Sequence, residues 1–99
     1  MSDNLSAAQQ AIISVCDEIR DTLLDKNRKY GNSALEPLRI FSRASAIEQL
    51  NVRADDKLSR IASAQDDDTE DPELDLIGYL ILKRVHRAVQ KGFDPTLAR

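Results

Sequence analysis

The sequence predicts an all-α fold, a small helical bundle of three long helices and one short helix. Two observations lead to this prediction. Apolar residues recur at steps of three and four, which places them on one side of a helix, and Ser-x-x-Gln or Ser-x-x-Glu capping boxes stand before these repeats. No stretch shows the apolar and polar alternation of a strand. The 99 residues suit one domain over 1–99 with its core over 6–91.

The first long helix is expected over 6–29. Ser6 and Gln9 form a capping box, in which each side chain bonds a backbone N–H that the helix leaves unpaired. The helix should end near Gly31-Asn32, since these residues tolerate a left-handed backbone. We expect Cys16 to fill the core, because no His or Asp is spaced to activate its thiol. The apolar side of this helix comprises Ile12, Val15, Cys16, Ile19 and Leu23.

Two further capping boxes predict the next two helices. Ser33 and Glu36 open a short helix over 33–42, and Ser45 and Glu48 open a helix of about five turns. The longer helix has the clearest amphipathic pattern in the chain. Its expected core side comprises Ile47, Leu50, Ala54, Leu58 and Ile61.

The polar stretch 64–70 is expected to be an acidic linker, and the last long helix follows it. Asp71 is a favoured N-cap residue and Pro72 stands at the favoured first helical position. The helix should run to about Lys91 and end at Gly92, leaving 92–99 as a C-terminal tail. Its later turns carry cations that suit the negative end of the helix dipole: Lys83, Arg84, Arg87 and Lys91.

The composition limits the kinds of partner that we expect the chain to bind. The net charge of −3 argues against binding to a nucleic-acid polymer. A single cysteine cannot form an internal disulfide, which indicates a cytoplasmic protein, and no apolar run approaches the length of a membrane span. A chain this short buries a limited fraction of its surface, so we expect a homo-oligomer, either a dimer or a tetramer.

The most apolar stretch, DPELDLIGYLILKR at 71–84, contains a carboxylate and a glycine in its middle. Helical geometry puts Asp71, Asp75 and Tyr79 on one side, at the border of an apolar face, so Asp75 should be partly buried. A buried carboxylate needs a partner. The partner is either an Arg or Lys of another helix or a hard cation such as Mg²⁺. Gly78 weakens the helix by about 1 kcal/mol relative to Ala, which fits a close approach of backbone or ligand.

Two other stretches combine charges at short spacing. In RADDKLSR at 53–60, Asp56 and Arg60 are expected to form an ion pair within the helix. In DKNRKYGNS at 25–33, lysines and a tyrosine stand at a helix exit, where cations are structurally favourable but where they also suit a phosphate or a base. The latter stretch is not a Walker loop. His86 is expected to be a surface residue, and no Ser or Cys is spaced for nucleophilic catalysis.

Three motifs taken in order resemble a known family. They are K-x-x-KYGNS at 26–33, R-x-DDKLSR at 53–60 and ED-x-x-x-DLIGYL at 70–80. Together they are similar to the nucleotide modification associated domain 1 family of small phage and bacterial proteins. That family is in turn similar to the all-α MazG-like and dUTPase-like nucleotide pyrophosphohydrolases. The resemblance covers about residues 22–88 and implies an all-α, usually oligomeric, nucleotide-handling domain.

The resemblance also implies roles for particular residues. Carboxylates from two helices would hold Mg²⁺, with Mn²⁺ as an alternative, and Asp56 and Asp75 would be the catalytic pair. The metal would neutralise nucleotide phosphates and position a water for attack on phosphorus. The implied metal ligands are Asp56, Asp71 and Asp75, supplemented by Glu48 and Glu70. The implied substrate-binding residues are Lys26, Lys29, Tyr30, Asn32, Arg53, Lys57, Arg60 and Tyr79.

The chain departs from the MazG-like pattern, which carries ExxE on one helix and ExxD on the next. The helix after Ser45 has no ExxE, and the acid before Asp75 stands four residues back, at Asp71. Three hypotheses therefore stay open. The chain is a Mg²⁺-dependent pyrophosphohydrolase of (deoxy)nucleoside triphosphates, a non-catalytic oligomer that sequesters a nucleotide or a signalling nucleotide, or a protein-binding inhibitor of a host factor.

Overall fold

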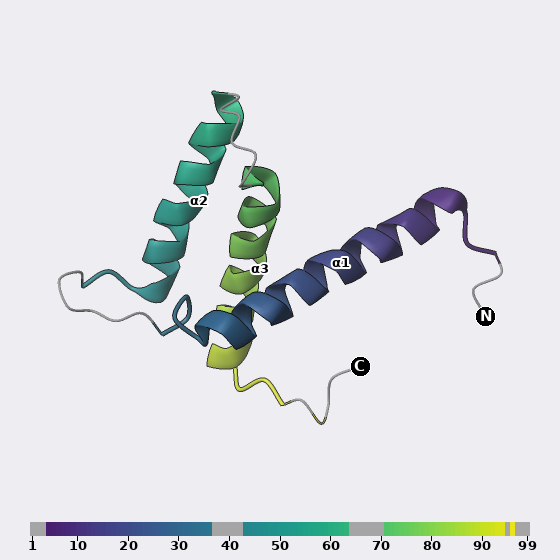
Figure 1. The fold of residues 1–99 in the computed structure, drawn as a ribbon. Coiled ribbons are helices and arrows are strands. Elements are labelled where there is room, and N and C mark those ends of the chain that lie inside the picture. Colours follow the sequence, from purple (N-terminus) through teal and green to yellow (C-terminus); the bar gives the residue numbers. More distant parts are fainter. Residues whose placement is uncertain (1–3, 37–42, 64–70, 95, 97–99) are drawn as a thin grey trace. The chain divides into compact units, whose positions relative to one another are not determined.

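The computed structural model describes residues 4–36, 43–63, 71–94 and 96, and in these ranges it contains three α-helices and no strand. They are α1 (Ala7–Tyr30), α2 (Ala46–Ala62) and α3 (Pro72–Gln90) (Figure 1). The predicted all-α fold class is confirmed. The chain divides into two compact units, Met1–Gly31 with α1 and Asn32–Arg99 with α2 and α3.

Helix α1 begins and ends where its capping residues predict. The Ser6 hydroxyl accepts a hydrogen bond from the backbone N–H of Gln9, and the Gln9 side chain accepts one from the Ser6 N–H, so the capping box is complete. Gly31 ends the helix at a φ of 64°, a conformation that a side chain disfavours. Its N–H donates to the carbonyl of Asn27 over 2.7 Å. Local sequence therefore sets both ends of α1.

The short helix expected over 33–42 is not present in its described part. Residues 33–36 form turns, in which the N–H groups of Leu35 and Glu36 both donate to the carbonyl of Asn32. Glu36 precedes Pro37, and the ring of a proline disfavours helical backbone in the residue before it. Residues 37–42 lie outside the described part of the chain, as does the predicted linker at 64–70.

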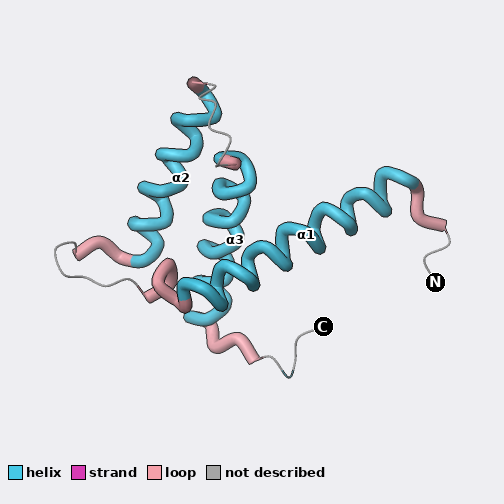
Figure 2. Tube along the Cα trace, viewed as in Figure 1, coloured by secondary structure: helices cyan, strands magenta, loops and turns pink. Residues whose placement is uncertain are grey.

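Helices α2 and α3 begin at the predicted caps. The Ser45 hydroxyl accepts from the N–H of Glu48 over 3.1 Å, and the Asp71 carboxylate accepts from the N–H of Leu74 over 3.0 Å. Pro72 occupies the start of α3. The two helices run antiparallel and pack on each other (Figure 2). They form the second unit, and their shared face contains the described core.

The buried side of α2 is rotated from the predicted one. Leu50 and Ala54 are buried as predicted, and with Ala46 they form the apolar core of the described residues. Leu58, however, is 50% exposed and Ile61 is 41% exposed, whereas Lys57 is buried. The prediction was wrong for Leu58 and Ile61. Helix α3 packs on the side of α2 that carries residues 46, 50, 54 and 57, and this packing buries the Lys57 side chain. On α3, Gly78 is buried.

Helix α1 has an apolar side that its own unit does not bury. None of its residues is buried; Ile12 is 61% exposed and Val15 is 54% exposed. Cys16 on the same side is exposed too, so the expectation that it fills a core is wrong for this structure. A single helix has no second element within its unit against which to pack this side.

Among the described residues, no helix is long and apolar enough to span a membrane.

Candidate functional site

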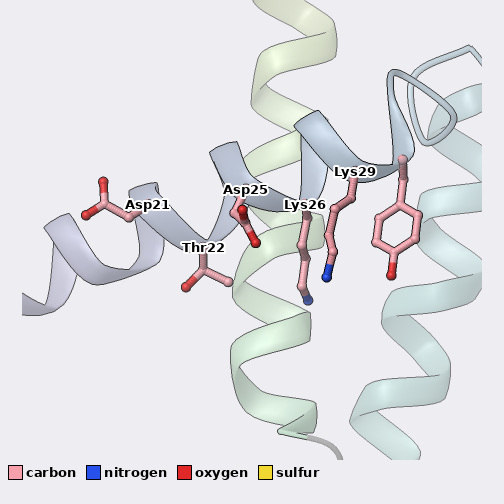
Figure 3. A pocket seen from close by; sticks show the side chains of 6 residues that line it. Asp21, Thr22, Asp25, Lys26 and Lys29 are labelled. Atoms are coloured by element: carbon pink, nitrogen blue, oxygen red, sulfur yellow. The ribbon is translucent and has the colours of Figure 1, made fainter.

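One side of α1 carries a hollow of about 370 Å³ near the end of the helix. Its lining residues form two adjacent rows at steps of four, the spacing that stacks side chains on one helix face. The rows are Asp21, Asp25, Lys29 and Thr22, Lys26, Tyr30. Figure 3 shows Thr22, Asp25, Lys26 and Lys29 pointing to the same side of the helix, whereas Asp21 points away from the two lysines.

The two ends of the hollow therefore differ in charge. Its lysines and the phenol of Tyr30 lie toward the C-terminal end of α1, and its carboxylates and the Thr22 hydroxyl lie about one turn earlier. The C-terminal end offers ammonium and hydroxyl donors. An anionic group such as a phosphate suits this end of the hollow.

The carboxylates of the hollow have neighbouring arginines on α1. The Asp21 Oδ1 atom lies 3.0 Å from Arg20 Nε, and Asp25 Oδ1 lies 3.7 Å from Arg28 Nη2. The hydrogen bond to Asp21, followed by the charges of Asp21 and Asp17, raises the pKa of Arg20, so the guanidinium stays charged. Both pairs are well exposed, and exposed pairs of this kind are weak. Either carboxylate can therefore exchange its partner for a ligand group at little cost.

Three of the predicted substrate-binding residues, Lys26, Lys29 and Tyr30, line this hollow together. Asn32 is not among the lining residues and belongs to the second unit. The sequence reasoning missed Asp21, Thr22 and Asp25. Thr22 precedes Lys26 by four residues, and Asp25 and Asp21 precede Lys29 by four and eight residues. This helical spacing is the signal that would have identified them.

The second candidate region lies where α2 meets α3. Lys57 Nζ is 3.2 Å from Asp75 Oδ2, and the two side chains are 9% and 19% exposed. This contact joins the motif RADDKLSR to the motif DLIGYL. Of the two partners that the sequence left open for Asp75, the structure contains the cation from another helix.

The other predicted metal ligands are engaged separately. Asp71 caps α3, and Asp56 pairs with Arg60 over 3.2 Å, which confirms the ion pair predicted within that helix. The described residues contain no group of three or more His, Cys, Asp or Glu side chains that could hold a metal ion, so Asp56, Asp71 and Asp75 are not gathered into one set. Glu70 lies outside the described residues.

This donor set does not fit a protein-built Mg²⁺ site. Mg²⁺ requires several oxygen ligands in near-octahedral geometry and takes one or two carboxylates where waters and substrate phosphates complete the shell. Asp75, the most buried of the three predicted ligands, faces an ammonium at 3.2 Å, which opposes a second cation. We therefore derive no step through a metal.

The remaining predicted residues lie in the second unit. Arg53 and Glu48 are exposed on α2, whereas Arg60 on α2 and Tyr79 and His86 on α3 are half-buried, so the surface position predicted for His86 is only partly met. Their roles stay predictions. From the sequence, Lys57 was predicted only to bind phosphate. Its burial was not predicted, because it depends on which side of α2 is covered by α3.

Comparison with known proteins found no matching family model, no matching curated protein and no matching solved structure.

Proposed function

We propose that this chain is a nucleotide-handling protein of the cytoplasm that binds the phosphates of its ligand at the hollow on α1. The observation that supports this proposal is that Lys26, Lys29 and Tyr30 line one hollow. They are three of the residues to which the resemblance to the nucleotide modification associated domain 1 family assigns substrate binding. The binding needs no metal, since two ammonium groups supply the positive charge.

The chemistry of the hollow suits a phosphate chain. Each lysine contributes a compact cation with several rotatable donors, and the Tyr30 hydroxyl adds a further donor. Hydrogen bonds to a charged group contribute about 1.5–3 kcal/mol each. Two such contacts would together contribute about 3–6 kcal/mol to the binding of a triphosphate. The volume of the hollow lies within the range of small-molecule sites.

Mg²⁺-dependent hydrolysis of (deoxy)nucleoside triphosphates is the second candidate function. One observation favours it: Lys57 and Asp75 join the two motifs that, by the resemblance, would make up the catalytic region. Against it stands the arrangement of the carboxylates: Asp75 faces the ammonium of Lys57, and the described acidic residues do not gather into a metal-binding group. Binding without cleavage has the stronger support, because it uses the hollow as it stands.

The first prediction is that the chain binds ATP and inorganic tripolyphosphate in the presence of EDTA. Isothermal titration calorimetry should show that Lys26→Gln combined with Lys29→Gln weakens both ligands at least tenfold, since each lost charged contact is worth about 1.4 kcal/mol or more. Chromatography of the recovered ligand should show intact ATP. In a parallel sample with Mg²⁺ or Mn²⁺, the release of pyrophosphate would favour the second candidate instead.

Arg87→Gln combined with Lys91→Gln is the matched control, because it also removes two positive charges, from a helix end that does not line the hollow. It should leave both affinities unchanged. Absence of binding to either ligand, or equal weakening by the control and by the variant at Lys26 and Lys29, would contradict the proposed site.

We also propose that the protein is a homo-oligomer. The support is the exposed apolar side of α1, including Ile12 and Val15, which a partner of the same sequence would cover.

A further inference from the structure

The hollow on α1 presents hydrogen-bond acceptors next to its cations. Thr22 lies one turn before Lys26, and Asp25 lies one turn before Lys29, so the Cβ atoms of each acceptor residue and its lysine are about 5–6 Å apart. Figure 3 shows these four side chains on the same side. The Asp25 carboxylate weakens the binding of a purely anionic ligand without preventing it, because the two lysines oppose its charge. The arrangement therefore favours a ligand that is anionic at one end and carries hydrogen-bond donors a short distance away.

A ribonucleotide has this polarity. Its 5′-phosphate is separated from the 2′- and 3′-hydroxyls by a single sugar ring, a length comparable to one helical turn. An ionised carboxylate only accepts hydrogen bonds, and two adjacent hydroxyls can donate to its two oxygens. A carboxylate that accepts from the ribose 2′-hydroxyl is also a general way in which proteins distinguish nucleotides. The Thr22 hydroxyl both donates and accepts, so it can complete the contact with the sugar.

We propose that Asp25 and Thr22 select a ribonucleotide over its 2′-deoxy counterpart, with Lys26 and Lys29 on the phosphates. This inference rests on the proposed binding of nucleotides at the hollow and adds the sugar to it. Asp25 is suited to the role because its side chain is 64% exposed and its arginine neighbour is 3.7 Å away, a weak pair that a ligand can replace. Asp21, which points away from the lysines, is not required.

The experiment measures the affinities for ATP, 2′-deoxy-ATP, inosine triphosphate and inorganic tripolyphosphate by calorimetry in EDTA. The unaltered chain should bind ATP about fivefold to tenfold more tightly than 2′-deoxy-ATP. Asp25→Ala combined with Thr22→Val should reduce this ratio to about one while leaving tripolyphosphate binding intact or slightly tighter, since a negative charge has been removed beside the phosphates. Asp17→Ala is the control: it removes the same charge from α1 outside the hollow and should preserve the ratio.

The outcomes separate this inference from the proposed function. Tripolyphosphate binding with equal affinities for ATP and 2′-deoxy-ATP would overturn the selection of ribose and leave the phosphate site standing. A preference for ATP over inosine triphosphate that disappears in Asp25→Ala would assign the carboxylate to the base amine and likewise overturn it. Failure to bind any of the four ligands would overturn both proposals.

Discussion

At the scale of single residues, the contact between Lys57 and Asp75 explains why an apolar helix contains a carboxylate. The two charged atoms lie 3.2 Å apart, and both side chains are largely shielded from water. Each charge would be costly to bury alone, whereas the pair satisfies both. Gly78, on the same side of α3, is buried as well. Asp75 and Gly78 therefore belong to the packing of α3 on α2.

The same pair yields a prediction about stability. Asp75→Asn removes the negative charge that faces the buried ammonium of Lys57, so the free energy of unfolding should fall by about 3 kcal/mol. Urea denaturation followed by circular dichroism measures this change. Asp56→Asn is the control, because its pair with Arg60 is exposed and exposed pairs contribute about 0–1 kcal/mol.

A second variant distinguishes an ion pair from a metal ligand. Lys57→Met combined with Asp75→Leu replaces both charges with apolar groups of similar size, and its stability should return to within about 1 kcal/mol of the unaltered chain. If Asp75 were held among other carboxylates for a metal, Asp75→Asn would instead stabilise the metal-free protein by relieving repulsion. That result would exclude the structural role argued here.

At the scale of elements, the ends of the helices follow from local hydrogen bonds. Ser6, Ser45 and Asp71 each accept a bond from a backbone N–H in the first turn that follows. These contacts join residues three apart in the sequence, so they depend on local sequence and not on tertiary packing. For this reason the starts of α1, α2 and α3 were predictable to within a residue.

The cap of α2 provides the prediction at this scale. Ser45→Ala removes the acceptor for the N–H of Glu48 and should lower the free energy of unfolding by about 1 kcal/mol. Ser59→Ala makes the same chemical change at an exposed site within α2, where Ala has the higher helix propensity, so this control should be neutral or slightly stabilising. Thermal unfolding monitored at the helical circular dichroism band tests both variants; equal effects would contradict the role of the cap.

At the scale of the whole molecule, the apolar side of α1 is the feature that its own unit leaves uncovered. Isolated helices are marginally stable in water, and most helical stability comes from the packing of an apolar side. A 24-residue helix with no buried residue therefore calls for a covering surface. We propose that a second copy of the chain supplies it.

Light scattering coupled to size-exclusion chromatography tests this assembly. The unaltered chain should have at least twice the 11.1 kDa mass of one copy. Ile12→Glu places a charge in the middle of the apolar side and should yield the monomer. Gln10→Glu adds the same charge on the opposite side of α1 and should leave the assembly intact. A monomeric mass for the unaltered chain would contradict the proposal.

The candidate site was predictable in part. Lys26, Lys29 and Tyr30 could be chosen from one short motif because residues three and four apart on a helix share a side. Asp25 and Thr22 were missed because single carboxylates and hydroxyls on an exposed helix have no distinguishing pattern until the neighbouring side chains are in place. The metal set stays a prediction: Asp56, Asp71 and Asp75 match the motifs in order, and in the structure each has a separate partner.

The sequence by itself determined the helical class, the helix starts and the turn at Gly31, because each depends on contacts between residues a few positions apart. Only the tertiary structure decided which side of α2 is buried and that Asp75 meets Lys57. Both depend on how α3 packs on α2. The apolar periodicity of the sequence predicts the buried side of α2 only to within about one residue position around the helix. A shift of this size exposes Leu58 and buries Lys57. The buried Lys57 then pairs with Asp75, for which the sequence had left open either a metal or a cationic side chain.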